Sequence, residues 1–403
     1  MLSSKAHGAL RLASIHNRAY EFFKRIGPLR RFVQGARGVW HRYRVPAWYV
    51  EGVSRTDAEP LSMVFVGHLE SKNYFAHLMF AGECAERFLG TTWTWNAWRN
   101  GVRLGPDMIV TRELSGSRPS RGRDRGYCIP SWIGTETDVD RAGALCRKSG
   151  SIKRDVRRLT RSGLTYVVTT DPEAIASFYH TMCLPYARRA HGNRAMLTPW
   201  EEFASELDCA ELIQVQRNGE TIAGNLLVDL GERRVRARAL GVKNGDLEYV
   251  QLGAVVALYY FMVEHLLKKG CEKIHFGASR PFLKDGVLGF KKKYGARIVD
   301  RDRHVFRVNV ARYSDGAKSF LRNNPFVSES NGCYYANFFV DRAADIDGKD
   351  FRSNVASLSI AGIAAARVYS LENARGPADA GGPVAEPVCF ELQPDAEPFA
   401  PET

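Results

Sequence analysis

The chain has 403 residues, more than a typical single domain holds, so we expect at least two domains. Its 45% hydrophobic and 25% charged residues are typical of a globular protein. The net charge of +13 is unevenly placed, since seven acids and one base after residue 370 leave +19 on the rest. This excess favours an anionic partner, namely a phosphorylated cofactor, a nucleic acid or an acidic membrane surface; a basic solubilising surface is the alternative.

The eight cysteines are scattered, with no Cys-x-x-Cys pair and no histidine at ligand spacing. This argues against a disulfide scaffold and a zinc site, so we expect no metal. Arg11 and Arg18 interrupt any apolar core of a secretory signal. The longest apolar run, residues 252–263, is shorter than the roughly 20 residues that span a bilayer. We therefore expect a soluble, cytoplasmic protein without an integral membrane segment.

Residues 1–45 form a basic N-terminal arm with ten Lys/Arg and one acid. Apolar residues recur in the arm at loosely helical spacing as far as Gly27-Pro28. This pattern fits a helix on a membrane surface, which would give peripheral membrane contact. It fits a helix packed on the next domain equally well.

A shorter apolar period begins at Pro46 and predicts an α/β domain over residues 46–145. The predicted strands lie at 47–53, 62–69 and 107–113, with a short helix at 72–80. Residues 91–98 are predicted as either a strand or an aromatic-rich turn.

The next domain is predicted over residues 146–315. It begins with an amphipathic helix at 151–161, where Ile152, Val156 and Leu159 recur at i, i+4 and i+7 and the polar face carries five bases. Then follow a strand at 164–169, a helix from Asp171-Pro172, antiparallel strands at 211–217, 221–230 and 233–242, a helix at 250–269, a strand at 273–276, a helix ending near residue 294 and a strand at 304–310.

The last part of the chain is predicted to lose order beyond about residue 345, within a C-terminal extension at 316–370. Residues 371–403 are rich in Pro, Ala and Glu and cannot bury enough apolar surface to fold. We expect them to form a disordered acidic tail.

Two sequence motifs, together with this order of elements, are similar to those of a known protein family. Ile274-His275-Phe276-Gly277-Ala278-Ser279-Arg280 is followed, after a loop, by Phe290-Lys291-Lys292-Lys293-Tyr294-Gly295-Ala296. The arrangement resembles the Gcn5-related N-acetyltransferase (GNAT) superfamily, in the branch of the FemAB-like aminoacyltransferases and similar bacterial acetyltransferases. Those proteins show a similar Phe-Gly-x-Ser, a loop, and Phe-Lys-x-x-aromatic-Gly.

The resemblance covers residues 150–310 well and residues 46–145 loosely. It implies an α/β (α+β) fold of tandem GNAT-like domains, with mixed central sheets flanked by helices. In this interpretation residues 46–145 are a degenerate first copy and residues 146–315 are the acyltransferase domain.

The resemblance also implies acetyl-CoA or another acyl-CoA as co-substrate. A helix that begins after residue 242 would offer its first free amides to a pyrophosphate. The usual Gln/Arg-x-x-Gly-x-Gly/Ala signature is not matched, because Gln251 lies only two residues before Gly253. Gly253 either lets the phosphates approach the backbone or allows close helix packing. The predicted cofactor-binding residues are Leu240, Gly241, Val242, Gln251, Leu252, Gly253, Ala254, Ser279 and Arg280.

In the implied reaction an amine attacks the donor carbonyl directly, so no covalent nucleophile is needed. The site must polarise the carbonyl, accept an unprotonated amine and protonate the leaving group. Amides around residues 240–242 would polarise the carbonyl, as the fold resemblance implies. The amine acceptor would be a small amine, such as an amino sugar of a cell-envelope polysaccharide.

Four residues near the second motif are the catalytic candidates. Lys291 stands where many acetyltransferases have a tyrosine and FemAB-like enzymes have a lysine, so we expect a phosphate clamp or a carbonyl electrophile; the alternative is a solvated helix face. Tyr294 is an alternative proton donor or a packing residue. His275 is either a base or structural. Asp285, with its neighbour Lys284, is a candidate for orienting the acceptor.

Three functions are consistent with the sequence. The first is an acyl-CoA-dependent N-acyltransferase, and the second is a FemAB-like enzyme that uses aminoacyl-tRNA, which the basic charge favours. The third is a non-catalytic basic protein that binds nucleic acid or a membrane surface. The absence of sustained heptads for a coiled-coil arm favours CoA over tRNA, and the absence of nucleic-acid-binding signatures argues against the third.

Overall fold

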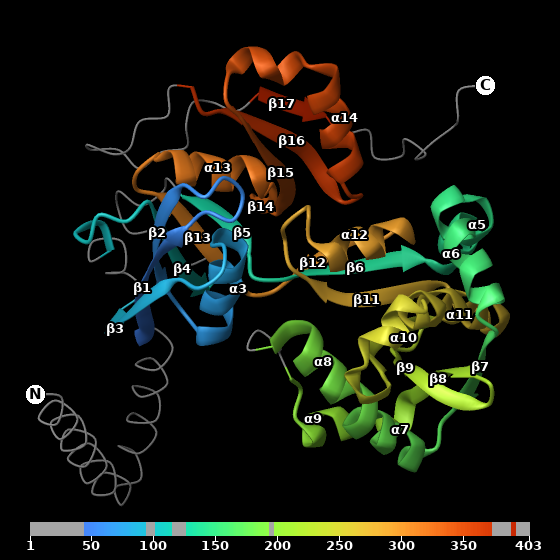
Figure 1. The fold of residues 1–403 in the computed structure, drawn as a ribbon. Coiled ribbons are helices and arrows are strands. Elements are labelled where there is room, and N and C mark those ends of the chain that lie inside the picture. The colour runs from blue at the N-terminus through green and yellow to red at the C-terminus, as the bar shows by residue number, and fades with distance from the viewer. Residues whose placement is uncertain (1–43, 94–100, 115–125, 193–196, 373–387, 392–403) are drawn as a thin grey trace, which may run out of the picture.

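The computed structural model describes residues 44–93, 101–114, 126–192, 197–372 and 388–391. Within these residues the chain forms three mixed sheets flanked by helices (Figure 1). The predicted fold class, mixed α/β with helix-flanked sheets, is confirmed. The predicted basic arm lies almost entirely outside the described residues, as does most of the predicted acidic tail. No helix in the described residues is long and apolar enough to cross a membrane.

The N-terminal sheet has six strands. In spatial order they are β3 (Ala85–Trp93), β1 (Arg44–Val53), β2 (Pro60–Val66), β4 (Met108–Leu114), β13 (His304–Val310) and β5 (Tyr127–Pro130). Helix α3 (Leu69–Met79) packs on it through Phe75, whose ring centroid lies 5.8 Å from that of Phe65 and 5.0 Å from that of Phe306. Helix α13 (Asp315–Asn323) adds Phe320 to the same core.

The central sheet has seven strands. In spatial order they are β12 (Arg297–Arg301), β6 (Ile133–Asp138), β11 (Lys273–Ser279), β10 (Arg234–Val242), β9 (Glu220–Asp229), β8 (Ala210–Arg217) and β7 (Leu164–Thr169). Its helices are α5 (Val139–Lys148), α6 (Gly150–Arg161), α7 (Pro172–Phe178), the π-helix η2 (Tyr179–Cys183), α8 (Leu184–His191), α9 (Trp200–Ala204), the 3₁₀ helices η4 (Leu207–Cys209) and η5 (Lys243–Gly245), α10 (Leu247–Gln251), α11 (Ala254–Lys269) and α12 (Gly286–Lys293).

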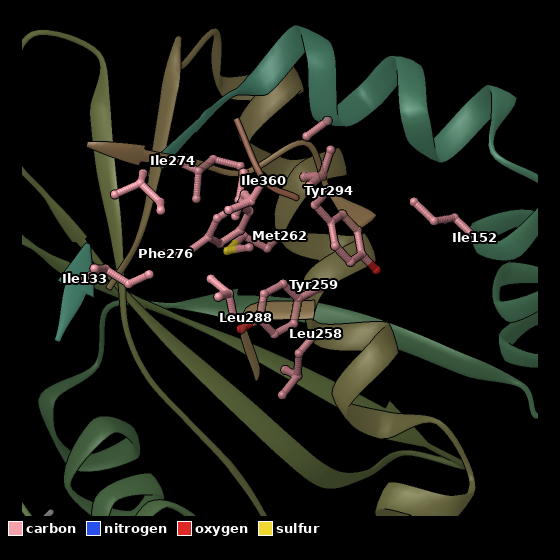
Figure 2. Close-up of a cluster of buried hydrophobic side chains, with 14 of the residues drawn as sticks. Ile133, Ile152, Leu258, Tyr259, Met262, Ile274, Phe276, Leu288, Tyr294 and Ile360 are labelled. Atoms are coloured by element: carbon pink, nitrogen blue, oxygen red, sulfur yellow. The ribbon is translucent and has the colours of Figure 1, made fainter. Parts of the chain in front are cut away.

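Both faces of the central sheet are covered, because neighbouring residues of a strand point to opposite sides. On β8, Ile213 belongs to the core that contains α5, α6 and α11, whereas Leu212 belongs to the core that contains α7, η2 and α9. Figure 2 shows the first of these cores, in which Met262 of α11 lies near Phe276 of β11; the ring centroids of Tyr259 of α11 and Phe276 are 5.8 Å apart. The long helix and the strand of the first motif therefore pack directly together.

The C-terminal sheet comprises β14 (Phe326–Ser330), β15 (Cys333–Val340), β16 (Ile363–Ser370) and β17 (Val388–Glu391), with η6 (Ala343–Asp347) and α14 (Lys349–Leu358) between β15 and β16. The prediction that order fades after residue 345 is wrong, since Ala366 and Val368 of β16 are buried in the main core. The prediction of a disordered tail is also wrong for residues 388–391, which pair antiparallel with β16. The remaining residues from 373 on lie outside the described part.

Two strands cross between the predicted domains. β6 comes from residues assigned to the first domain, yet it pairs with β11 and β12 of the central sheet. β13 was expected as the last strand of the second domain, yet it pairs with β4 and β5 of the N-terminal sheet. The predicted place of residues 304–310 is therefore corrected, and β12 takes that place beside β6. The β5–β6 connection between the sheets thus lies beside the end of β11, where Ser279 pairs with Ile133.

Candidate acyl-transfer site

The central sheet opens between two of its strands. β10 and β11 pair in parallel at only three positions, from Arg234 opposite Lys273 to Arg236 opposite His275. Beyond them β10 runs on to Val242, with a bulge in its pairing to β9 between Ala237 and Ala239. β11 keeps its antiparallel pairing with β6 on its other edge, with an irregularity between His275 and Ala278. Backbone groups on this side of β10 consequently lack β11 as a ladder partner, which leaves them free for a ligand.

Gly277 lies where the two strands part. Its φ of +72° favours glycine, and a Cβ on it would lie 3.6 Å from the Ala237 carbonyl oxygen of β10. The Gly277 amide donates to Nδ1 of His275 at 3.2 Å, and its carbonyl accepts from Thr135 Oγ1 at 3.3 Å. The Phe-Gly-x-Ser motif therefore builds the turn away from β10.

Lys291 reaches this turn from α12 and is buried, at 3% exposure. Its ammonium donates to the carbonyl oxygens of Gly277 at 3.2 Å and Ala278 at 2.9 Å, and to Ser279 Oγ at 2.8 Å. Burial lowers the pKa of Lys291 to about 7. Lys291 does not lie on the solvated helix face, whereas Lys293 is exposed. All three N–H donors are used, so a contact to a ligand must replace one of these acceptors.

His275 forms a hydrogen bond through one ring nitrogen and lies near a carboxylate with the other. Nδ1 accepts from the Gly277 amide, so the proton of the neutral ring is on Nε2, which lies 3.7 Å from a carboxylate oxygen of Asp300. Burial lowers the pKa of His275, and the Asp300 carboxylate only partly opposes this. A neutral ring with Nδ1 occupied has no free lone pair to take a proton from an amine.

The side chains of Tyr294 and Asp285 both help to hold α12, the helix that carries Lys291, in place. Tyr294 is buried at 1% exposure, beside the ring of Tyr259 (Figure 2). It also contacts the ring of Phe290, and burial raises the pKa of its hydroxyl. Asp285 is the N-cap of α12 and accepts from the amides of Val287 and Leu288, each at 3.0 Å. The structure therefore places neither side chain in the opening beside β10.

The predicted helix over 250–269 is two helices, because Gly253 breaks it. Gly253 has a φ of +97°, and a Cβ on it would lie 3.2 Å from the side chain of Leu159 on α6. The carbonyl of Gln251, at the end of α10, accepts a hydrogen bond from Arg158 of the same helix α6. Both readings of Gly253 are thus compatible with its place: close packing with α6, and a free helix start at Ala254.

The start of α11 suits the phosphates of a CoA molecule. The first three amides of this 16-residue helix, from Ala254 on, have no acceptor within the helix. Exposed bases of α6 lie nearby, since Arg158 and Leu159 contact the α10–α11 junction. The exposed bases of α6 that form no ion pair within the described residues are Lys153, Arg154, Arg157 and Arg161. The donors present are therefore the kind that bind phosphate.

The other predicted binding residues lie at the two strand ends. Gly241 is pressed against η2, where a Cβ would lie 2.5 Å from the Met182 carbonyl carbon, so the π-helix covers this part of β10 beside Leu240 and Val242. Ser279 is buried and bound to Lys291. Arg280 lies between the rings of Tyr74 and Trp132, at the junction of the N-terminal and central sheets. The structure thus brings Gly277, Ser279 and Lys291 together and keeps Arg280 beside them.

Several residues of this region carried no sequence signal. Asp300 and Glu136 belong to β12 and β6, two strands that were not predicted. Glu136 accepts from Lys273 at 3.2 Å and Arg297 at 3.3 Å, which lowers its pKa although burial opposes the shift. In the described residues no group of three or more His, Cys, Asp or Glu side chains could hold a metal ion.

Comparison with known proteins shows that the strands that form the opening lie within a stretch similar to a known family. Residues 147–292 match the family model described as the acetyltransferase (GNAT) domain. No curated protein matches the sequence significantly.

Similar solved structures include a tandem GNAT protein from the clavulanic acid biosynthesis pathway, at 12% identity over 65% of this chain and 82% of that one, with a TM-score of 0.26. A GCN5-related N-acetyltransferase from Kribbella flavida is 11% identical over 61% of this chain and 80% of its own, with a TM-score of 0.27. The L-PGS structure from Bacillus licheniformis is 13% identical over 64% and 83%, with a TM-score of 0.33. Similarity at this level carries no argument about reaction or substrate.

Proposed function

Because residues 147–292 match the family model of the GNAT acetyltransferase domain, we propose that this chain is an N-acyltransferase that moves an acyl group from acyl-CoA to an amine. The observation that carries the proposal is the opening between β10 and β11, with buried Lys291 at one side. Acyl-CoA would supply the thioester, and the start of α11 would bind its phosphates. Both features lie within residues 147–292, the part of the chain that the family model matches.

Direct transfer requires few groups. The amine nitrogen attacks the thioester carbonyl carbon, a C–N bond forms, and the C–S bond breaks. The proton lost by nitrogen balances the proton gained by the departing sulfur. The free backbone groups of β10 beyond Arg236 are suited to polarise the carbonyl oxygen, which takes up negative charge in the transition state.

Lys291 is the side chain that we assign to this charge. In its protonated form it can exchange its 3.2 Å bond to the Gly277 carbonyl for a bond to the donor oxygen, while Ala278 and Ser279 keep it in place. This favours the predicted role of carbonyl electrophile over that of phosphate clamp. His275 then serves to hold the Gly277 amide, and Tyr294 to pack the helix that carries Lys291.

An aminoacyl-tRNA donor, as in the FemAB-like branch, is the second candidate. The unpaired bases of α6 favour it, because a row of exposed cations suits a nucleic-acid backbone. Binding of an acyl-CoA donor requires only the start of α11 and some of the exposed bases of α6. We therefore place the acyl-CoA reaction first.

A binding experiment separates the two donors. With the full chain, acetyl-CoA at sub-millimolar concentration should raise the melting temperature, and uncharged tRNA should not bind tightly at physiological salt. Substituting Gly253→Ala places a strained φ at the start of α11 and should weaken the acetyl-CoA effect. No shift with acetyl-CoA, together with tight tRNA binding, would reject the proposal in favour of the second candidate.

A further inference from the structure

Arg280 is a buried cation that the proposed reaction does not use. It follows Ser279, the residue that binds Lys291, and only 6% of its surface is exposed. Its guanidinium carbon lies 3.8 Å from the ring centroid of Trp132 and 4.3 Å from that of Tyr74. Stacking on two rings fixes the plane of the guanidinium and leaves its edge as the part that can bind.

That edge is largely unfilled. Among the described residues, the guanidinium forms one hydrogen bond, from Nη1 to the Ser131 carbonyl at 3.2 Å. The hydroxyl of Ser131 is itself buried and has no partner in the described part of the chain. A buried cation normally has a carboxylate partner, because an unpaired one costs free energy.

The nearby carboxylates do not supply one. Asp285 and Asp302 act on Arg280 only through space. Asp285 is occupied as the cap of α12, and Asp302 bonds to the His304 ring at 3.2 Å. Neither comes within ion-pair distance of Arg280, so its charge is not neutralised locally.

A second arginine increases the positive charge at the same place. Arg112 of β4 is half-buried, forms no ion pair with any described residue, and repels the charge of Arg280. Burial lowers the pKa of both arginines, that of Arg280 to about 10, so both are charged at neutral pH. The carboxylates of Asp302 and Glu70 act on Arg112 through space, and an anion bound at the open edge of Arg280 would offset the charge of Arg280 directly.

We propose that Arg280 binds an oxyanion, a carboxylate or a phosphate, carried by the amine acceptor. This inference rests on the proposed N-acyltransferase function and names the class of its acceptor. The N–H groups on the open edge of the Arg280 guanidinium can donate hydrogen bonds to two oxygens of such a group at once. Its place next to Ser279 sets the anion close to the Lys291 end of the opening, so that the amine of the same molecule can reach the donor carbonyl.

The binding test uses the full chain with inorganic phosphate and with acetate as probes. Wild-type protein should show saturable stabilisation against heat by one of them, and the stronger probe distinguishes a phosphate from a carboxylate site. Arg280→Met should abolish the stabilisation. Arg303→Met is the matched control, because Arg303 is exposed and free of ion pairs in the described residues, and it should behave as wild type.

The turnover test compares amines in pairs that differ only in one carboxylate or phosphate group. Arg280→Met should lower kcat/KM for the anionic member of each pair by roughly 10- to 100-fold and leave the neutral member unchanged. Arg112→Met removes a charge that acts on Arg280 only through space, so it should have a smaller effect than Arg280→Met. Arg280→Lys keeps the charge but not the fork, and it supplies a folded variant if Arg280→Met does not fold.

The outcomes separate this inference from the proposed function. Loss of probe binding in Arg280→Met, without turnover of any amine by wild type, would reject the acyltransferase function and retain the anion site. Equal probe binding and equal acceptor preference in wild type and the arginine variants would overturn the inference alone. Weaker acetyl-CoA binding in Arg280→Met, with acceptor preference unchanged, would assign Arg280 to the donor and also overturn it.

Discussion

Two groups of basic side chains at the central sheet differ in whether a carboxylate pairs with them. At β10, Arg236 and Arg238 share the carboxylate of Glu206, with Arg238 Nε at 2.7 Å. At the end of β11, Lys291 and Arg280 are more deeply buried, and among the described residues no carboxylate lies within ion-pair distance of them. The first group needs no ligand to account for it. Burying the second group without a carboxylate partner costs solvation free energy. Cations buried in this way are typical of sites that act on a ligand.

The largest effect is expected from removing the buried ammonium. Lys291→Met should lower kcat/KM by roughly 10²–10⁴-fold, because the donor oxygen loses its charged hydrogen-bond donor. Steady-state kinetics with acetyl-CoA and an amine would measure it. Lys293→Met, on the exposed face of the same helix, is the control and should keep wild-type activity. Equal activity in the two variants would remove Lys291 from the mechanism.

The pH dependence of stability should also show the buried lysine. The pKa of Lys291 is about 7 in the folded chain and near its ordinary 10.5 in the unfolded chain. Between these values the unfolded chain binds the extra proton, so the unfolding free energy should rise with pH, by up to about 1.4 kcal/mol per pH unit. Urea denaturation of wild type at pH 7 and pH 9.5 would measure the gain, taken relative to Lys291→Met. A pH slope that is the same in the variant would contradict the assigned burial.

A smaller effect is expected at the paired cations. Glu206→Gln leaves Arg236 and Arg238 without their shared charge and should reduce the unfolding free energy by about 1–3 kcal/mol. Glu202→Gln is the control, because Glu202 is exposed and lies 3.6 Å from Arg238, and it should change stability by less than about 1 kcal/mol. Denaturant titration of both variants provides the comparison. Equal stability of both variants would mean that the β10 pairing contributes little.

The smallest effect is expected at His275. His275→Gln keeps an acceptor for the Gly277 amide and should change kcat/KM by less than about 3-fold, well short of the roughly 10²-fold that loss of a general base costs. His275→Leu removes the acceptor and should cost more. A 100-fold loss in the glutamine variant would restore His275 as a base.

The sequence predicted the elements whose periodicity or turn signals are local. The spacing of Ile152, Val156 and Leu159 indicated α6, and the bounds of β7 and β13 agree with the predicted strands. The helix at 250–269 was predicted as one, because a single glycine within an apolar run gives no sign of its φ of +97°. The C-terminal hairpin was missed although Asn331 and Gly332, both with positive φ, form its turn.

The site was predictable in its motif and not in its contacts. Lys291 and Ser279 were identified through the family-like motifs, and they meet in the structure. The pairing of β6 with β11 could not be inferred, because it depends on a strand from a distant part of the chain and β6 shows no strong alternation. Burial of Lys291, and the stacking of Arg280 on Trp132, are consequences of that long-range pairing.

The central claim is that this chain transfers an acyl group from CoA to an amine with the help of Lys291. Release of free thiol from acetyl-CoA, measured with the full chain and a panel of amines, tests it most directly. We expect amine-dependent thiol release with one acylated amine per thiol, reduced at least about 100-fold in Lys291→Met. No amine-dependent release by wild type across acyl-CoA donors, or equal release by the variant, would contradict the claim.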